Sequence, residues 1–140
     1  MAEKILYNAL LKEKKPYNKI AVVSTGIYSI NNQKASSYSI ETLQELNIDL
    51  SKHKSKILTQ KIIDKCFVIF FMTEFHRKIT NHYFNTKNKK MYLMRELMPN
   101  IFDIEISDPI GRKLIDYKLC CKKMMEAIPS IINFVKANYL

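Results

Sequence analysis

The sequence predicts an α/β fold, a three-layer sandwich in which a parallel sheet is flanked by helices. β-branched and aromatic runs alternate along the chain with stretches that have apolar residues at helical spacing. The most apolar run, CFVIFFM from Cys66 to Met72, is typical of a strand that is buried on both faces, as in a parallel sheet. The length of 140 residues, with 47% hydrophobic side chains, fits a single domain over residues 1–140.

The first half of the chain predicts a helix, a strand and a second helix. Ala2 to Lys15 carries apolar residues on one helical face, and Pro16 ends the pattern. Lys19 to Thr25 reads KIAVVST, a β-branched run that predicts a strand ended by Gly26. Helical spacing resumes after a polar loop, at Ile40, Leu43 and Leu46.

The second half continues the alternation. Thr59 and Thr73 are suited to cap helices on either side of the strand at Cys66 to Met72. MYLMREL, from Met91 to Leu97, predicts a further strand. Asp108 and Pro109 then occupy the N-cap and first position of a predicted last helix, whose apolar stripe extends to Val135.

The net charge is strongly positive, because 23 Lys and Arg residues outnumber 13 Asp and Glu residues. The cations are spread along the chain, and only two groups are clustered: Lys52, Lys54 and Lys56, and Lys87, Lys89 and Lys90. No zinc-ligand spacing or RNA-binding motif accompanies them. We therefore expect a solvated basic surface rather than nucleic-acid binding.

The sequence predicts no membrane span, no signal peptide and no metal site. No apolar run approaches the roughly 18 residues that a span needs. The three cysteines, Cys66, Cys120 and Cys121, form no even disulfide framework, which is consistent with the cytoplasm. His76 and His82 have no carboxylate or cysteine at ligand spacing, so we expect no metal.

Five motifs occur in a specific order: Met1-Ala2-Glu3, VVSTG, IDLSKHKSKILT, FMT and SDPIG. In this order and spacing the sequence resembles the low-molecular-weight protein tyrosine phosphatase superfamily, over essentially its whole length. FMT with His76 nearby, and DPIG in place of DP followed by two tyrosines, resemble the bacterial branch that includes protein arginine phosphatases. The resemblance implies a phosphorylated protein as substrate, a phosphocysteine intermediate and no cofactor.

The catalytic loop of this family has the form C-x5-R. Its backbone N–H groups cradle the phosphate and lower the cysteine pKa, and its arginine binds the phosphate oxygens. No C-x5-R is present, because the residues six positions after the three cysteines are Met72, Glu126 and Ala127. In the family this loop immediately precedes the segment that matches Met1. We therefore expect no phosphatase activity from this chain. A start codon placed too late, or a degraded gene, would explain the missing loop.

The resemblance assigns roles to three residues. Asp108 matches the general acid, which protonates the leaving group and then activates water. Thr25 and His53 match positions that support the phosphate loop. The alternative for Asp108 is a helix cap ahead of Pro109, and for His53 a surface histidine.

The resemblance also implies a sheet of four strands in the order 2-1-3-4, of which the first, central strand is missing here. The KIAVVST and CFVIFFM strands would then have unpaired edges. These edges make self-association possible. The alternative to a phosphatase is accordingly a non-catalytic pseudo-phosphatase that binds a partner protein.

Overall fold

The computed structural model describes residues 1–139 and has a parallel sheet flanked by helices, as predicted. Strands β1 (Val68–Phe71) and β2 (Lys90–Leu93) form the sheet of this part of the chain. They pair in parallel, with Val68 opposite Lys90 and Phe71 opposite Leu93. The strand predicted at Cys66 to Met72 is thus confirmed in its central four residues.

The helices of the described chain follow the predicted order. They are α1 (Ala2–Leu11), the short 3₁₀ helix η1 (Tyr17–Lys19), α2 (Ser37–Gln44), α3 (Gln60–Lys65), α4 (Glu74–Tyr83) and α5 (Leu114–Asn138). Thr59 caps α3, because its hydroxyl accepts a hydrogen bond from the N–H of Ile62. Thr73 caps α4 in the same way, with the N–H of His76 as donor. Both predicted caps are confirmed.

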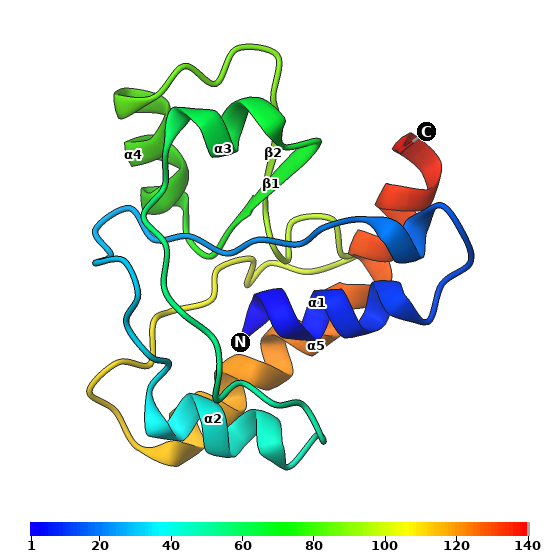
Figure 1. Ribbon diagram of the computed structural model, residues 1–140. Helices are drawn as coiled ribbons and strands as arrows, with labels where there is room; N and C mark the ends of the chain where they lie inside the picture. The colour runs from blue at the N-terminus through cyan, green and yellow to red at the C-terminus, as the bar shows by residue number, and fades with distance from the viewer. Residues whose placement is uncertain (140) are drawn as a thin grey trace.

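Helices cover both faces of the sheet (Figure 1). On one face, the ring of Phe134 from α5 packs against Phe70 and Tyr92, at centroid distances of 6.4 and 5.2 Å. Because side chains alternate along a strand, Phe71 and Leu93 point to the opposite face, where α4 contacts both strands. In Figure 1, α3 and α4 lie together to the left of the strands, α1 and α2 lie below them, and α5 rises on the right to the C-terminus.

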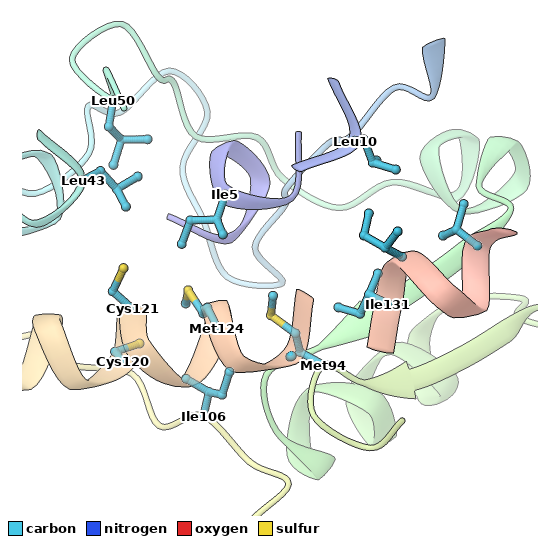
Figure 2. Close-up of a cluster of buried hydrophobic side chains, with 13 residues drawn as sticks. Ile5, Leu10, Leu43, Leu50, Met94, Ile106, Cys120, Cys121, Met124 and Ile131 are labelled. Carbon is cyan, nitrogen blue, oxygen red and sulfur yellow. The ribbon is translucent and has the colours of Figure 1, made fainter. Parts of the chain in front are cut away.

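The main core lies between α1, α2 and α5. Figure 2 shows Ile5 and Leu10 extending from α1 toward α5, which contributes Met124 and Ile131. Leu43 of α2 is fully buried in the same cluster. Cys121 belongs to the same cluster.

The predicted strand at Lys19 to Thr25 is wrong. Lys19 ends η1, and residues 20–25 are extended but belong to no sheet. A β-branched run becomes a strand only when another strand pairs with it, and among the described residues no ladder forms along this segment. Pairing begins only at Gly26, as an isolated parallel bridge to Ile57.

Two other predicted boundaries are also wrong. The strand predicted over Met91 to Leu97 ends at Leu93. The chain turns there because the carboxylate of Glu96 accepts a hydrogen bond from the N–H of Leu93, at 2.7 Å. The last helix begins at Leu114 rather than at Asp108 and Pro109, since Gly111 has a φ of 74°, which interrupts a right-handed helix.

Candidate functional site

A pocket of about 270 Å³ lies at the carboxyl end of β1. It is bordered by the start of α1, the start of α2, α4, the 106–110 segment and α5. Its lining side chains are Met1, Ser36, Ser39, Met72, His76, Ile106, Ser107, Asp108, Pro109, Ile110, Tyr117, Cys120 and Met124. Ligands of parallel α/β folds bind at this edge of the sheet, because the loops that follow the strands meet there.

Asp108 is exposed at this pocket. The segment that carries it is anchored to the sheet by Ile106, whose N–H donates to the carbonyl of Met72 at 2.8 Å and whose side chain is buried. Because Met72 directly follows β1, this bond fixes Ile106 beside the end of the strand, and Asp108 follows two residues later in the chain. The general-acid candidate therefore borders a pocket, as its proposed role requires.

A tight turn orients the Asp108 carboxylate. Its Oδ1 accepts a hydrogen bond from the N–H of Ile110 at 3.0 Å, and the N–H of Arg112 donates to the carbonyl of Pro109 at 2.9 Å. Gly111 occupies the turn position that needs a positive φ. Asp108 therefore caps this turn and not the last helix, which excludes the helix-cap alternative.

His53 lies beside the first turn of α1. Its Nδ1 is 3.6 Å from the carboxylate of Glu3. The same carboxylate accepts two hydrogen bonds from Ser24, one from the backbone N–H at 2.7 Å and one from the hydroxyl at 2.8 Å. Glu3, Ser24 and His53 thus form one partly buried polar cluster, which we call the Glu3 cluster.

Thr25 is not a member of this cluster. Within residues 1–139 its hydroxyl has no hydrogen-bond partner, whereas the neighbouring Ser24 binds Glu3 twice. Adjacent side chains of an extended segment point to opposite sides, so only one of the two can face α1. The loop-supporting role predicted for Thr25 and His53 stays a prediction, and the structure shows that His53 and Ser24 both contact the carboxylate of Glu3.

The Glu3 cluster shifts the pKa values of its members. Burial alone would raise the pKa of Glu3, but the two hydrogen bonds from Ser24, together with His53 and Lys56, lower it. Burial lowers the pKa of His53; Glu3 opposes this shift, and the Met1 ammonium, Lys4 and Lys56 reinforce it. The carboxylate is thus held in its ionised form.

The start of α1 connects the pocket to the Glu3 cluster. Met1 lines the pocket, and Glu3 lies two residues further along the chain. Thr25 and His53 do not line the pocket. The structure therefore brings Asp108 to the pocket directly, whereas His53 is linked to it only through Glu3 in the first turn of α1.

None of the three cysteines is an activated nucleophile. Cys120 lines the pocket, but burial raises the pKa of its thiol to about 11. Burial also raises the pKa values of Cys66 and Cys121. Because a thiolate is the nucleophile, all three are protonated and weakly reactive at neutral pH.

His76 lines the pocket together with Asp108. Its position follows from the Thr73 cap, which places it in the first turn of the helix after β1. The residues that the structure describes contain no group of three or more His, Cys, Asp or Glu side chains that could hold a metal ion. No helix in residues 1–139 is long and apolar enough to cross a membrane.

The parallel sheet, its flanking helices and a pocket at the carboxyl end of β1 place the chain among α/β proteins, and comparison with known proteins identifies the family. The profile of the low molecular weight phosphotyrosine protein phosphatase family matches residues 1–139. The chain therefore belongs to this family. No curated protein matches the chain.

Solved structures of related proteins share the fold. The YwlE arginine phosphatase from Geobacillus stearothermophilus is 20% identical with a TM-score of 0.83, over 97% of this chain and 83% of that chain. A low molecular weight protein tyrosine phosphatase from T. tengcongensis is 24% identical with a TM-score of 0.81, over 94% and 87%. A protein tyrosine phosphatase from Entamoeba histolytica is 15% identical with a TM-score of 0.85, over 99% and 89%.

Proposed function

We propose that this chain, a member of the low-molecular-weight protein phosphatase family, carries the general acid of that family, and that Asp108 is this acid. The supporting observation is the position of Asp108: it is exposed on a pocket at the carboxyl end of β1 and held by a turn at Pro109 to Arg112. An acid at this position can donate a proton to the leaving atom of a bound phosphorylated residue. In its ionised form it can then accept a proton from an attacking water.

We further propose that the 140-residue chain does not hydrolyse phosphorylated substrates by itself. Formation of a phosphocysteine needs a thiolate and a cationic group for the phosphate oxygens. No cysteine of the sequence is followed by arginine at the sixth position, and the thiol at the pocket, Cys120, has a raised pKa. The pocket lining also contains no lysine or arginine.

The substrate of the family chemistry would be a phosphorylated protein side chain, either phosphotyrosine or phosphoarginine. Solved relatives include proteins described as arginine phosphatases and others described as tyrosine phosphatases. Ile110 and Gly111 replace the two tyrosines of the phosphotyrosine cleft, which weakens the case for phosphotyrosine. Phosphoarginine and phosphotyrosine peptides, assayed side by side with a chimera that has a C-x5-R segment ahead of Met1, would distinguish them.

A chimera tests the role of Asp108. The C-x5-R segment of a family member is joined ahead of Met1, and hydrolysis of p-nitrophenyl phosphate is measured for the chimera, for Asp108→Asn and for Asp64→Asn. Asp64 is an exposed acid on α3 and serves as the matched control. We expect Asp108→Asn to lower kcat about 10²- to 10⁴-fold, as loss of a general acid does, and Asp64→Asn to leave it unchanged. Equal activity of both variants would refute the assignment.

A non-catalytic binding protein is the second candidate function. The observation that favours it is the extended segment 21–25. Within the described chain, the N–H of Ser24, which donates to Glu3, is the one backbone group of this segment that forms a hydrogen bond. Unpaired backbone groups of this kind can pair with another polypeptide, including a second copy. A discrete dimer in light scattering would support this candidate function. A monomer at micromolar concentration would exclude self-association as the form of binding.

We infer a reducing compartment, the cytoplasm, as the site of action. Cys66, Cys120 and Cys121 are all free thiols in the structure. Disulfides are rare in reducing compartments, and a family that works through a thiolate depends on such conditions. Fractionation of cells that express a tagged chain, with cytoplasmic and secreted marker proteins, tests this inference.

A further inference from the structure

The segment that carries Asp108 is fixed to two elements by two neighbouring residues. The N–H of Ile106 donates to the carbonyl of Met72 at 2.8 Å, at the end of β1. One residue earlier, the side chain of Glu105 reaches α4, where its Oε1 accepts a hydrogen bond from the N–H of Glu74 at 2.8 Å. Glu74 is the first residue of α4. Glu105 thus ties the segment before Asp108 to a helix that begins 31 positions earlier in the chain.

The bond from Glu74 to Glu105 satisfies part of a helix N-terminus. The first N–H groups of a helix have no partner within it, so they need acceptors from outside. In α4 the hydroxyl of Thr73 accepts from the N–H of His76, and the carboxylate of Glu105 accepts from the N–H of Glu74. A carboxylate suits this position, because the N-terminal end of a helix carries a partial positive charge. The contact is therefore favourable both as a hydrogen bond and as a charge–dipole interaction.

No other polar contact of Glu105 explains its position. Within residues 1–139 its carboxylate forms no ion pair and accepts no second hydrogen bond. Arg77, the cation in the same turn of α4, is engaged by Glu74 and Glu96 instead. The Glu105 side chain is also exposed, so burial does not hold it in place. The bond to α4 is the contact through which this residue can act.

Both elements that Glu105 joins contribute to the pocket. α4 supplies His76, and the segment after Glu105 supplies Ser107 and Asp108. The N–H of Ile110 orients the Asp108 carboxylate at 3.0 Å, but this bond lies within one turn and does not fix the turn against its surroundings. Among the hydrogen bonds of the described chain, the one at Glu105 links this segment directly to α4.

We propose that Glu105 is a positioning residue for the general acid, and that it holds Asp108 within reach of the leaving atom of a substrate in the pocket. This inference rests on the proposed function of Asp108. General-acid catalysis needs hydrogen-bond reach, and a displacement of about 1 Å can cost about 100-fold in rate. Glu105 does not line the pocket, so it touches no substrate and acts only through Asp108.

A positioning role has a consequence that depends on the leaving group. A leaving group of high pKa, such as phenol, needs a proton as it departs, whereas p-nitrophenol has a lower pKa and depends less on the acid. Displacement of the acid should therefore slow hydrolysis of phenyl phosphate more than that of p-nitrophenyl phosphate. A variant that merely loosens the fold would slow both reactions equally.

The test measures kcat/KM for both substrates on the chimera that supplies a C-x5-R segment. Glu105→Ala removes the acceptor for the N–H of Glu74, and Glu105→Gln keeps an acceptor oxygen while removing the charge. Gln60→Ala is the matched control, because Gln60 accepts a hydrogen bond of 2.9 Å from the N–H of Asn85, beyond the other end of α4. Asp108→Asn is measured alone and together with Glu105→Ala.

We expect Glu105→Ala to lower kcat/KM about ten-fold for phenyl phosphate and less than about three-fold for p-nitrophenyl phosphate. Glu105→Gln should recover most of the loss. In the Asp108→Asn background Glu105→Ala should have no further effect, because a positioning residue acts only through the acid.

The outcomes separate this inference from the proposed function. Equal losses for both substrates, a loss of the same size in Gln60→Ala, or additive losses in the double variant would overturn the role of Glu105 and leave that of Asp108 intact. If Asp108→Asn itself has no effect, the proposed function is refuted and this inference falls with it.

The unmodified 140-residue chain offers a second measurement that needs no activity. ¹⁵N relaxation of the Ile110 N–H reports on the turn at Asp108, because this group donates to the Asp108 carboxylate. We expect Glu105→Ala to lower its order parameter from about 0.85, typical of rigid backbone, toward about 0.6, and Gln60→Ala to leave it unchanged. Circular dichroism of each variant confirms the fold. An order parameter that Glu105→Ala does not lower would overturn the proposal.

Discussion

The carboxylate of Glu3 accepts two hydrogen bonds from Ser24, at 2.7 Å from the backbone N–H and 2.8 Å from the hydroxyl. The two residues are 21 positions apart, so these bonds tie the first turn of α1 to the extended segment before Gly26. His53 lies on the other side of the same carboxylate. Glu3 thus connects three segments next to the pocket that holds Asp108.

Glu3→Gln should destabilise the fold. Hydrogen bonds to a charged group contribute about 1.5–3 kcal/mol each, and glutamine retains an acceptor but loses the charge, so we expect a loss of about 1–2 kcal/mol. Chemical denaturation of Glu3→Gln and of Glu41→Gln, an exposed residue of α2, measures it. Equal midpoints for the two variants would contradict the proposed role of the Glu3 cluster.

The stability of the protein should fall as the pH is lowered from 7 to 5. The pKa of His53 is lowered from its ordinary value of 6.5 in the folded state. Below pH 6.5 the unfolded chain therefore binds a proton that the folded chain resists, which favours unfolding. Glu3, whose pKa is lowered from 4.5, contributes stability above that pH and loses it at lower pH.

His53→Gln isolates the histidine contribution. Denaturation midpoints measured between pH 7 and 5 should depend less steeply on pH in this variant than in the parent protein. His82→Gln, on the exposed surface of α4, is the control and should keep the parent slope. A slope that His53→Gln leaves intact would show that other groups carry the acid sensitivity.

Arg95 should be the most sensitive of the charged residues. Its side chain is 6% exposed and donates to the carbonyls of Asp103 and Lys123, at 2.9 and 3.0 Å, and to the carboxylate of Glu126. Arg95→Ala leaves two carbonyls without their donor, and we expect a loss of about 2–4 kcal/mol. Glu126→Gln, which removes only the half-exposed partner, should cost less than about 1 kcal/mol in the same thermal unfolding experiment.

Pro129→Ala should stabilise the protein. Pro129 lies in the interior of α5, where it has no N–H to donate, and its side chain is exposed. Alanine restores a helical hydrogen bond, and we expect the free energy of unfolding to rise by about 1–3 kcal/mol. Part of this gain is offset because the unfolded chain becomes more flexible without the proline. A lower melting temperature for Pro129→Ala would show that the helix depends on the proline geometry.

Local signals predicted the helices well. Thr59 and Thr73 cap α3 and α4 as expected, because a cap depends on a few neighbouring residues. The strand prediction for KIAVVST is wrong because a strand needs a neighbouring strand to pair with, and the run itself does not specify one. The predicted start of α5 is wrong because the positive φ of Gly111 interrupts the helix that the capping pattern of Asp108 and Pro109 predicts.

The candidate site was predictable only through the resemblance. The SDPIG motif points to Asp108 only through the family resemblance, and the structure adds its pocket and its turn. Ser24 was missed because the register of an extended segment, which decides whether Ser24 or Thr25 faces α1, is set by tertiary contacts. No local pattern predicts the role of Glu3, because its partners lie 21 and 50 positions away.

The most direct test of the account is a phosphatase assay of the unmodified 140-residue chain. The chain has the family fold and Asp108 at its pocket but no C-x5-R. We predict that it releases p-nitrophenol from p-nitrophenyl phosphate no faster than buffer does, with or without vanadate. Vanadate-sensitive turnover that disappears in Asp108→Asn would contradict the account and show that the chain has a nucleophile of its own.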